Sequence, residues 1–323
     1  MPDFEVLRGS EAVSALTEFA FPEESSNVFQ GSCWLRLWNA LHGYECGILL
    51  IKDGAEVTGY FPFCIRQRFG LRECYSMPMG TYGGAVTRGD TAPQRVRDSF
   101  VKWSSGRGFS RINVIEFGAK EGASYSSFES AHHSTHVLRL NRDRESLYAG
   151  LSDNHKRNLK KAEKIKTEIT AVSSESDVEE YYMLVQESAD RHREYPRYDL
   201  DFYKLLRRTV PENELSWQLL RVDGKICVGH IYFKWAKEII SWDSCSSSVG
   251  RKGSLNYSLY WHNIETFNDR GYITFNFGSS PRGADDLVYF KTGWGAVETT
   301  YYEYDRQSTF YRTVRRVKGW FRQ

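Results

Sequence analysis

The sequence lacks the features that mark several large classes of protein. Its six cysteines are scattered through 323 residues, with no C-x-x-C pair and no zinc-site spacing. Because disulfide frameworks belong mainly to small secreted domains, we expect all six to be reduced thiols. The first residues, MPDFEVLRGSEAVS, have neither a basic start nor an apolar segment, so no secretory signal peptide is predicted. No apolar run approaches the length of a membrane span. These absences predict a soluble, cytoplasmic protein.

Charge of one sign is also scarce, and the common catalytic motifs are missing. The formal net charge is only +2, so any contact with a polyanion must be local. The sequence contains no G-x-S-x-G elbow, Walker loop or H-E-x-x-H helix. His132, His133 and His136 precede the strand-like run VLRL, and no acidic third ligand is implied. We therefore expect neither a metal nor another bound cofactor.

The sequence does contain an internal repeat. The segment LLIKDG, ending at Gly54, leads to Phe63, and the segment LLRVDG, ending at Gly224, leads to Phe233. The offset is constant, since 224 − 54 = 170 and 233 − 63 = 170. Each copy is typical of two strands joined by an Asp-Gly turn, because this pair supplies the positive φ values of a tight hairpin.

The similarity continues beyond the two hairpins. A helical stretch over residues 92–105 precedes the strand-like RINVIE, and another over 255–268 precedes ITFN, with Gly271 ending the second helix. The expected apolar side of that second helix carries Leu255, Leu259, His262 and Thr266. Antiparallel hairpins followed by alternating helices and strands predict an α/β chain with mixed sheets and helices on their faces.

A basic segment, LYAGLSDNHKRNLKKAEKI, separates the two halves. Ser152 or Asp153 is expected to cap a helix on which basic residues recur in two stripes. One stripe consists of Lys156, Lys160 and Lys164, and the other of Arg157 and Lys161. Such a helix either presents an ordinary solvated face or contacts the phosphates of a nucleic acid. The residues alone leave both interpretations open.

The stretch NFGSSPRGADDLVYFKTGWGA, residues 276–296, sets one lysine between aromatic residues and glycines. Lys291 follows Phe290 and precedes Gly293 and Trp294. A partly desolvated ammonium there could stabilise an oxyanion or hold the end of a donor, and the glycines would let a bulky donor approach. The alternative is an edge-strand lysine whose charge reaches solvent.

These motifs resemble those of the FemAB-type aminoacyl/acyltransferases. The closing stretch is similar to that family's D-F-G-x-S and F-K-x-x-W-G motifs, and the basic segment is similar to R-x-N-x-x-K-A. The loop MPMGTYGGAV is similar to P-x-x-x-Y-G-G, and DRHREYPRYDLDFY is similar to a segment in which an arginine precedes a proline and a Phe-Tyr helix. The chain departs from the pattern at Asn276, where relatives usually have Asp, and at Ser279, where they often have Arg. No coiled-coil arm is apparent.

The resemblance implies two tandem domains of the Gcn5-related N-acetyltransferase (GNAT) fold, residues 1–150 on the acceptor side and 151–323 on the donor side. It implies an enzyme that transfers an acyl or aminoacyl group to an amine. The best-known relatives take amino acids from aminoacyl-tRNA to build peptidoglycan bridges, so charged tRNA is an expected donor and partner. An acyl-CoA donor is the alternative. The acceptor would be an amine-bearing small molecule or a cell-envelope precursor.

The resemblance also assigns residues to a site. Lys291 is the expected catalytic residue, with Phe290, Gly293 and Trp294 beside the donor. The expected acceptor-binding residues are Arg36, Tyr82, Gly83, Arg191 and Arg193, because an arginine fork suits a phosphate or carboxylate. The basic residues expected to contact a tRNA donor are Lys156, Arg157, Lys160, Lys161 and Lys164.

Two further features are predicted from the residues themselves. The segment VGRKGSLN opens a helix, so Arg251, Lys252 and Gly253 are candidates to bind a phosphate. The resemblance implies that this would be the pyrophosphate of an acyl-CoA donor. Asp243 and the pair Asp285-Asp286 are candidate general bases, and no pattern selects between them. The departures at Asn276 and Ser279 leave a third alternative, a binding module that kept the fold and lost the reaction.

Overall fold

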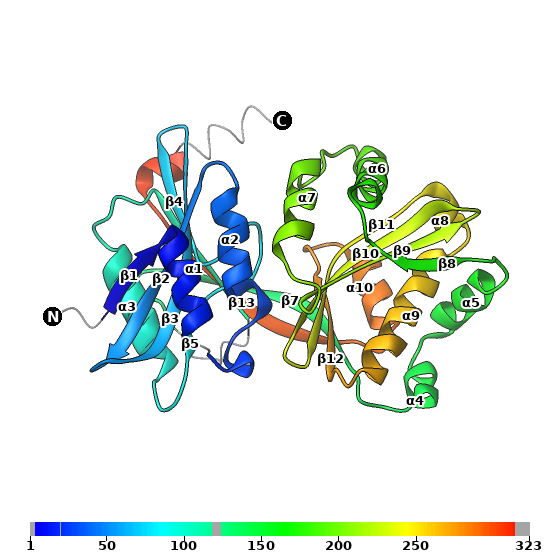
Figure 1. Ribbon diagram of the computed structural model, residues 1–323, viewed down its shortest axis with the longest axis horizontal. Helices are drawn as coiled ribbons and strands as arrows, with labels where there is room; N and C mark the ends of the chain where they lie inside the picture. The colour runs from blue at the N-terminus through cyan, green and yellow to red at the C-terminus, as the bar shows by residue number, and fades with distance from the viewer. Residues whose placement is uncertain (1–3, 20, 118–123, 314–323) are drawn as a thin grey trace. The chain divides into compact units, whose positions relative to one another are not determined.

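The computed structural model describes residues 4–19, 21–117 and 124–313 (Figure 1). This described chain forms two compact units. The first unit comprises residues 4–133 and 300–313, and the second comprises residues 134–299. Among the helices in these ranges, we find none with the length and apolar character needed to cross a bilayer.

The first unit is a mixed sheet with helices on both faces. Its strands lie in the order β1-β2-β3-β4-β6-β13, with β5 beside β3, and only β4 and β6 run parallel. The elements are β1 (Phe4–Arg8), α1 (Gly9–Glu18), η1 (Glu23–Ser25), η2 (Val28–Gln30), α2 (Ser32–Ala40), β2 (Tyr44–Asp53), β3 (Glu56–Arg68), β4 (Leu71–Tyr75), β5 (Val86–Thr87), α3 (Pro93–Ser104), β6 (Arg111–Glu116) and β13 (Val297–Gln307).

The second unit repeats this plan. Its strands lie in the order β7-β12-β11-β10-β9-β8, and only β11 and β12 run parallel. The elements are β7 (Glu129–Arg139), α4 (Arg144–Ala149), α5 (Asp153–Ala162), β8 (Glu168–Ala171), α6 (Glu175–His192), α7 (Leu200–Thr209), β9 (Leu215–Val222), β10 (Lys225–Trp235), β11 (Glu238–Ser246), α8 (Ser248–Lys252), α9 (Leu255–Asp269), β12 (Thr274–Ser279) and α10 (Asp285–Thr292).

Each sheet takes its last strand from the other half of the chain. β7 follows β6 in sequence, but its residues 135–139 pair with β12 of the second unit. The last strand, β13, instead pairs through residues 302–307 with β6 of the first unit. The compact units are therefore bounded by these two exchanged strands, and the division into tandem domains 1–150 and 151–323 stays a prediction.

Both hairpins of the repeat are present, but the offset between them is 169 rather than 170. β2 ends at Asp53 and β9 ends at Val222, and 222 − 53 = 169. Each hairpin has one unpaired bulge residue, Thr58 in β3 and Cys227 in β10, and 227 − 58 = 169. The repeat was aligned on its two Asp-Gly pairs. Relative to these pairs, the turn of the second hairpin begins one residue earlier than that of the first.

This difference of one residue decides which side chains face which helices. Phe63 packs on Trp103 of α3, the helix that follows its hairpin, with ring centroids 4.4 Å apart. Phe233 instead packs on Trp242 at 5.4 Å, and Trp242 lies against Phe202 of α7, a helix that precedes its hairpin. Successive side chains of a strand point to opposite faces, so a slip of one residue reverses every contact. The matched phenylalanines therefore have different partners.

The two predicted helices of the repeat are confirmed as α3 and α9. The apolar side of α9 was only partly predicted. Leu255 and Leu259 are buried as expected, but His262 is exposed, and the buried face continues through Ile264 and Phe267. The neighbouring strand β10 supplies Val228 to the cluster of Leu255 and Leu259, and Tyr232 to the cluster of Ile264 and Phe267.

Two of the cysteines are joined. Cys46 of β2 lies directly opposite Cys64 of β3 in the antiparallel register, and a disulfide links them. The expectation of six reduced thiols is therefore wrong for this pair. A search for cysteine motifs compares spacing along the chain, whereas strand register brings together cysteines that are 18 residues apart. The free cysteines are Cys33, Cys74, Cys227 and Cys245, all of them buried.

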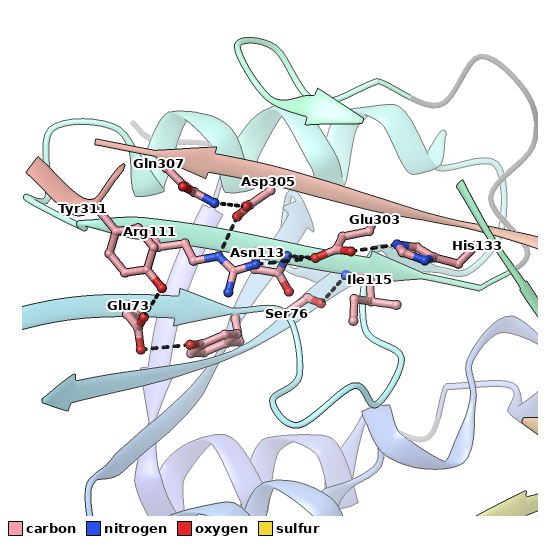
Figure 2. A network of polar contacts seen from close by, with 11 residues as sticks. Glu73, Ser76, Arg111, Asn113, Ile115, His133, Glu303, Asp305, Gln307 and Tyr311 are labelled. Atoms are coloured by element: carbon pink, nitrogen blue, oxygen red, sulfur yellow. Dashed lines mark hydrogen bonds and ion pairs between the residues drawn. The ribbon is translucent and has the colours of Figure 1, made fainter. Parts of the chain in front are cut away.

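A polar network holds β13 on β6 in the first unit (Figure 2). Arg111 Nε donates to Asp305 Oδ1 over 2.7 Å, and Asn113 Nδ2 donates to Glu303 Oε1 over 2.6 Å. Glu303 also contacts Nε2 of His133 at 2.8 Å, so this histidine has a carboxylate neighbour within the fold. The network fixes the returning strand by charge-assisted hydrogen bonds.

A second network is buried at the other end of β6. Arg97 of α3 makes two hydrogen bonds to the carboxylate of Glu116, of 3.1 and 2.7 Å, and Tyr125 donates a third over 2.8 Å. Arg97 is 8% exposed and Glu116 is 4% exposed. Each charge is therefore stabilised mainly by the other, because water is excluded from both.

We expect Arg97→Met to lower the free energy of unfolding by about 3–5 kcal/mol, because it leaves the Glu116 carboxylate buried without its cation. The matched control is Arg95→Met on the exposed side of the same helix, which we expect to change it by less than about 0.5 kcal/mol. Urea unfolding of both variants measures the difference. Equal effects would contradict the importance of the buried pair.

Candidate functional site

The site in the second unit begins where two parallel strands separate. β11 and β12 pair only from Glu238 with Thr274 to Ile240 with Asn276. A bulge then disturbs β11, because Ile231 lies opposite Asp243 and the next residue of β10 lies opposite Ser241. Beyond Ile240 the described ladder between β11 and β12 stops, so backbone groups along this edge of β11 are left for another partner.

Lys291 lies on α10 and is buried beside the end of β12. Only 4% of the residue is exposed, and its Nζ donates to the carbonyl oxygens of Gly278 and Ser279 over 2.7 and 2.8 Å. Burial lowers its pKa from 10.5 to about 8. In the described parts of the chain, no carboxylate forms an ion pair with it. At neutral pH the site therefore holds a desolvated ammonium whose third N–H has no described acceptor.

The segment around Lys291 is helical, whereas the sequence suggested an edge strand or a loop. On α10, Lys291 is the one buried residue, since the other side chains are exposed or partly buried. The rest of the helix follows two acidic residues, Asp285 and Asp286, which are exposed in its first turn. Negative charge at a helix N-terminus is favourable, so these carboxylates need no catalytic explanation.

His155 of α5 locks that helix to α10. Its Nε2 donates to the carbonyl oxygen of Phe290 over 2.9 Å, and its Nδ1 lies 2.9 Å from Oγ of Ser152. Burial lowers the pKa of His155 to about 4, so the ring is neutral, and the contact with a carbonyl places the proton on Nε2. A backbone bond from Ser152 N to Gly293 O, 2.9 Å long, completes the lock.

The glycine and tryptophan of the closing motif serve this packing. A Cβ at Gly293 would lie 2.0 Å from the ring of His155, so only glycine fits. Trp294 is 1% exposed and lies 4.7 Å from the same ring, centroid to centroid. The structure thus supplies a reason for both residues other than the expected approach of a donor. Phe290 is partly buried and packs 5.3 Å from Tyr257.

The departure at Asn276 preserves the local structure. Its Oδ1 accepts from Oγ1 of Thr135 over 2.6 Å and from the backbone N–H of Gly278 over 2.9 Å. Its Nδ2 points to the carboxylate of Glu238 at 3.4 Å. An aspartate here would face Glu238 with like charge, whereas the amide keeps the acceptor and adds a donor.

The basic segment contains the expected helix as α5, and its first residues belong to the preceding helix, α4. Ser152 caps α5 by accepting from His155 N, as one of the two expected caps. The helix ends at Ala162, so Lys164 lies beyond it and does not continue the stripe of Lys156 and Lys160. The sequence did not show where the helix ends, because basic residues continue at the same spacing beyond Ala162, its last buried residue.

The two basic stripes have different surroundings. Lys156 Nζ donates to Ala149 O over 3.1 Å and lies over the ring of Tyr148. Arg157 is exposed and donates to Oδ1 of Asn154 over 2.8 Å. Within residues 124–313, no ion pair to a carboxylate occupies the cations of α5, so their charge is available to an anion.

The predicted phosphate loop is a short helix. Residues 248–252 form α8, capped by Ser247, and Ser248 N donates to Glu187 Oε1 over 2.7 Å. Arg251 also pairs with Glu187, at 3.3 Å. Gly253 is close-packed, since a Cβ would lie 2.8 Å from the side chain of Ile165. Lys252 is exposed. The segment is therefore already helical before α9 begins, and the binding of a donor phosphate by Arg251, Lys252 and Gly253 stays a prediction.

The Tyr-Gly-Gly loop is well packed in the first unit. Tyr82 is 5% exposed and stacks on Phe117 with centroids 5.0 Å apart. Gly83 donates its N–H to Ile115 O over 2.7 Å, and a Cβ on it would lie 2.6 Å from Ser76. The loop therefore extends the sheet beside β6. Gly83 is explained by its close packing on Ser76.

The predicted acceptor arginines are exposed and belong to different units. Arg36 lies on α2 of the first unit. Arg191 lies in the last turn of α6 in the second unit, and Arg193 caps that helix in a left-handed conformation with φ 57°. Arg191 donates to Ser188 Oγ over 3.2 Å.

Asp243 is the most enclosed of the candidate bases. It accepts from the hydroxyl of Tyr203 over 2.8 Å, and burial raises its pKa. It lies on the face of β11 covered by α6 and α7, on the other side of the sheet from α9. The residue that sequence reasoning missed altogether is His155, for which the only signal was its position three residues after Ser152.

Comparison with known proteins places this geometry in a known fold. Residues 151–291 match the family described as acetyltransferase (GNAT) domain. No curated protein matches the sequence. The solved structure of FemX is similar over 94% of this chain and 97% of its own, with a TM-score of 0.69 and 13% identity.

Two other solved structures share the fold. One is the C-terminal domain of a putative lysylphosphatidylglycerol synthetase from Agrobacterium fabrum, with a TM-score of 0.62, 13% identity, and coverage of 94% of this chain and 95% of its own. The other is a tandem GNAT protein from the clavulanic acid biosynthesis pathway, with a TM-score of 0.58, 9% identity, and coverage of 94% and 98%. The expected tandem GNAT-like fold and the FemAB-type resemblance are therefore confirmed at the level of the fold.

The buried ammonium gives stability a specific dependence on pH. In the unfolded chain Lys291 keeps its proton up to about pH 10.5, but in the folded protein only up to about pH 8. Between these values the unfolded state binds more protons, so the free energy of unfolding rises with pH. Relative to Lys291→Met, we expect the wild type to gain about 2 kcal/mol between pH 7.5 and 10. Chemical denaturation of wild type and variant across that pH range measures the difference in the free energy of unfolding. Lys237→Met, at an exposed lysine, is the control, and its difference from the wild type should not change with pH. The expectation would be contradicted if the Lys291→Met difference were equally independent of pH.

The lock between α5 and α10 can be tested by a double-mutant cycle. Gly293→Ala forces a methyl group into the His155 ring and should lower the free energy of unfolding by about 1–3 kcal/mol. His155→Ala removes that clash but leaves a cavity. We expect the double variant to be more stable than the sum of the two losses predicts. Strict additivity would show that the two residues do not meet.

Proposed function

We propose that this chain is an acyltransferase that moves an acyl or aminoacyl group from an ester or thioester to an amine. The observation that carries the proposal is Lys291, an ammonium held in a dry site beside the point where β11 and β12 separate. A buried charge without a carboxylate partner is costly to the fold. Buried charges of this kind are found most often at functional sites, so the burial of Lys291 favours a catalytic role.

The reaction requires a group of this kind. The nitrogen of the acceptor attacks the donor carbonyl, a C–N bond forms, and negative charge gathers on the carbonyl oxygen. The C–O or C–S bond to the carrier then breaks, and the proton lost by the amine ends on the departing hydroxyl or thiol. Lys291 would stabilise the oxyanion with its remaining N–H, as a preorganised donor in a low-dielectric site. Its contacts with Gly278 and Ser279 keep the ammonium in place.

We favour an aminoacyl-tRNA donor over acyl-CoA. The cations of α5 have only neutral described acceptors, such as Asn154 for Arg157, so they can meet phosphates. The corresponding residue for a CoA phosphate, Arg251, is engaged by Glu187. For the acceptor we keep an amine-bearing small molecule or cell-envelope precursor, with Arg36, Arg191 and Arg193 exposed for an anionic group.

The third alternative, a binding module without activity, rested on the departures at Asn276 and Ser279. Asn276 makes the hydrogen bonds that hold the end of β12, and Ser279 presents its carbonyl to Lys291. Neither departure removes a contact that positions the ammonium. This favours a working enzyme.

We expect Lys291→Ala to lower kcat at least about 100-fold, as loss of a single oxyanion donor does elsewhere. Transfer of a radiolabelled amino acid from charged tRNA, or of acetyl from acetyl-CoA, to a panel of amines measures it. The matched control Lys237→Ala removes an exposed lysine and should leave turnover unchanged. Full turnover by a folded Lys291→Ala protein would contradict the assignment of Lys291 as a catalytic residue.

A further inference from the structure

The hairpin of β3 and β4 in the first unit places a phenylalanine in a tight turn where its conformation is unfavourable. Phe69 and Gly70 connect the two strands, since Arg68 pairs with Leu71. Both turn residues have positive φ, 51° for Phe69 and 70° for Gly70. Asparagine and glycine adopt this conformation readily, whereas a bulky side chain adopts it at a cost. The turn itself therefore does not explain a phenylalanine at this position.

The same side chain lies at the outer end of the hairpin. Phe69 is 75% exposed, and a Cβ added to Gly70 would have no other atom within 4 Å. Figure 1 shows this hairpin extending past the helices of the first unit. A single exposed apolar residue is ordinary on a protein surface. One that also has an unfavourable backbone conformation is a reason to look for a function, because such strain gathers at functional sites.

Arginines surround this turn. Together with Phe69 they form what is here called the tip surface, which consists of Arg66, Arg68, Phe69, Arg72 and Arg107. The guanidinium of Arg68 lies 4.8 Å from the centroid of the Phe69 ring. Arg72 donates to the carbonyl oxygen of Arg107 over 2.8 Å, which joins the hairpin to the end of α3. Four cations are therefore gathered at one end of a chain whose net charge is only +2.

The described contacts of these arginines leave their charge available. They lie over aromatic rings: Arg66 over Tyr44, Arg72 over Phe109 and Arg107 over Trp103. Among residues 4–19, 21–117 and 124–313, no carboxylate forms an ion pair with any of the four. Glu73 lies opposite Arg66 in the strand register, but its carboxylate accepts from the hydroxyls of Tyr75 and Tyr311. A local positive field therefore faces solvent at the tip surface.

The last part of the chain adds charge of the same sign beside β4. Residues 309–313 are helical, and within them Tyr311 donates to Glu73 of β4 over 2.7 Å. The neighbouring Phe310 is 66% exposed. The sequence after residue 313 is VRRVKGWFRQ, with four basic residues, two aromatic residues and no acidic one. Basic residues mixed with large apolar ones are typical of segments that bind the surface of an anionic membrane.

We propose that the tip surface binds the face of an anionic phospholipid bilayer, with Phe69 inserted between the head groups and the arginines on lipid phosphates. Aromatic side chains favour the interfacial layer of a bilayer, and the planar fork of arginine suits a phosphate. The long arginine side chains can follow the head groups while the turn enters between them. Such binding is reversible, because one inserted ring and a basic patch are two weak signals that act together.

A nucleic acid also offers phosphates, but the tip surface suits it less well. Recognition of a single strand uses several aromatic rings, on which successive bases stack along a groove. The turn instead presents one ring, Phe69, at the end of a projecting hairpin, and Arg68 already lies over this ring. A single apolar residue at a projecting point can enter a lipid layer without any groove.

The test is co-sedimentation of the full chain with vesicles of equimolar phosphatidylglycerol and phosphatidylcholine, compared with vesicles of phosphatidylcholine alone. We expect binding to the anionic vesicles only, and release when salt is raised from about 0.05 to about 0.5 M. Phe69→Asn should weaken binding about tenfold, because it removes the inserted ring. Arg68→Gln should weaken it about fivefold, the effect of one basic residue near such a surface.

The controls separate binding from folding. Asparagine suits the turn, so Phe69→Asn should keep the melting temperature of the wild type, and Phe69→Gly should show the same loss of binding. Tyr195→Asn removes a side chain that is 96% exposed in the second unit, and Lys237→Gln removes an exposed cation there. Both controls should bind vesicles as the wild type does. So should Lys291→Ala, because the inference does not rest on the proposed reaction.

Three results would overturn the inference. The first is equal binding of anionic vesicles by folded Phe69→Asn and by Tyr195→Asn. The second is failure of the wild type to bind anionic vesicles while it retains a single-stranded RNA in a Phe69-dependent way, which would assign the tip surface to nucleic acid. The third is a dimer in sedimentation velocity that Phe69→Asn dissociates, since the tip surface would then join two copies of the chain.

Discussion

Two carbonyl groups at the end of β12 are turned toward one buried ammonium, and the second unit is arranged around that contact. Lys291 can reach Gly278 and Ser279 only because β11 and β12 stop pairing after Ile240, which leaves room at the end of the strand. It can stay there only because α10 is fixed from the other side by His155. The end of β12 thus supplies the hydrogen-bond acceptors for Lys291, and α10 holds the lysine in a fixed position.

The secondary structure was largely predictable from sequence, but strand register was not. Asp-Gly pairs and apolar runs identified both hairpins because a tight turn needs special backbone angles that few residues supply. The same letters suggested an offset of 170, whereas the bulges at Thr58 and Cys227 set it at 169. A bulge depends on packing between strands, which leaves no local mark in sequence. The disulfide between Cys46 and Cys64 was missed for the same reason.

The sequence identified the central residue of the site, but it did not show why the neighbouring residues are present. A lysine between aromatic residues was recognised as unusual, and its burial agrees with that expectation, although its catalytic assignment stays a prediction. The glycine at 293 was attributed to a bulky donor, yet its space is filled by His155, which lies 138 residues earlier (293 − 155 = 138). Contacts between such distant segments cannot be inferred from a motif that is read by itself.

The exchange of last strands imposes an order on folding in the first unit. β6 lacks its outer partner until β13 has been made, and the ion pair between Arg111 and Asp305 joins residues 194 positions apart. Closing so long a loop is slow, and an unpaired strand edge invites association with other chains in the meantime. Arg111 on the waiting edge of β6 discourages pairing with an apolar strand, whereas Glu303 and Asp305 give β13 the matching charges. The polar network of Figure 2 therefore favours pairing of β6 with β13 over pairing with an apolar strand.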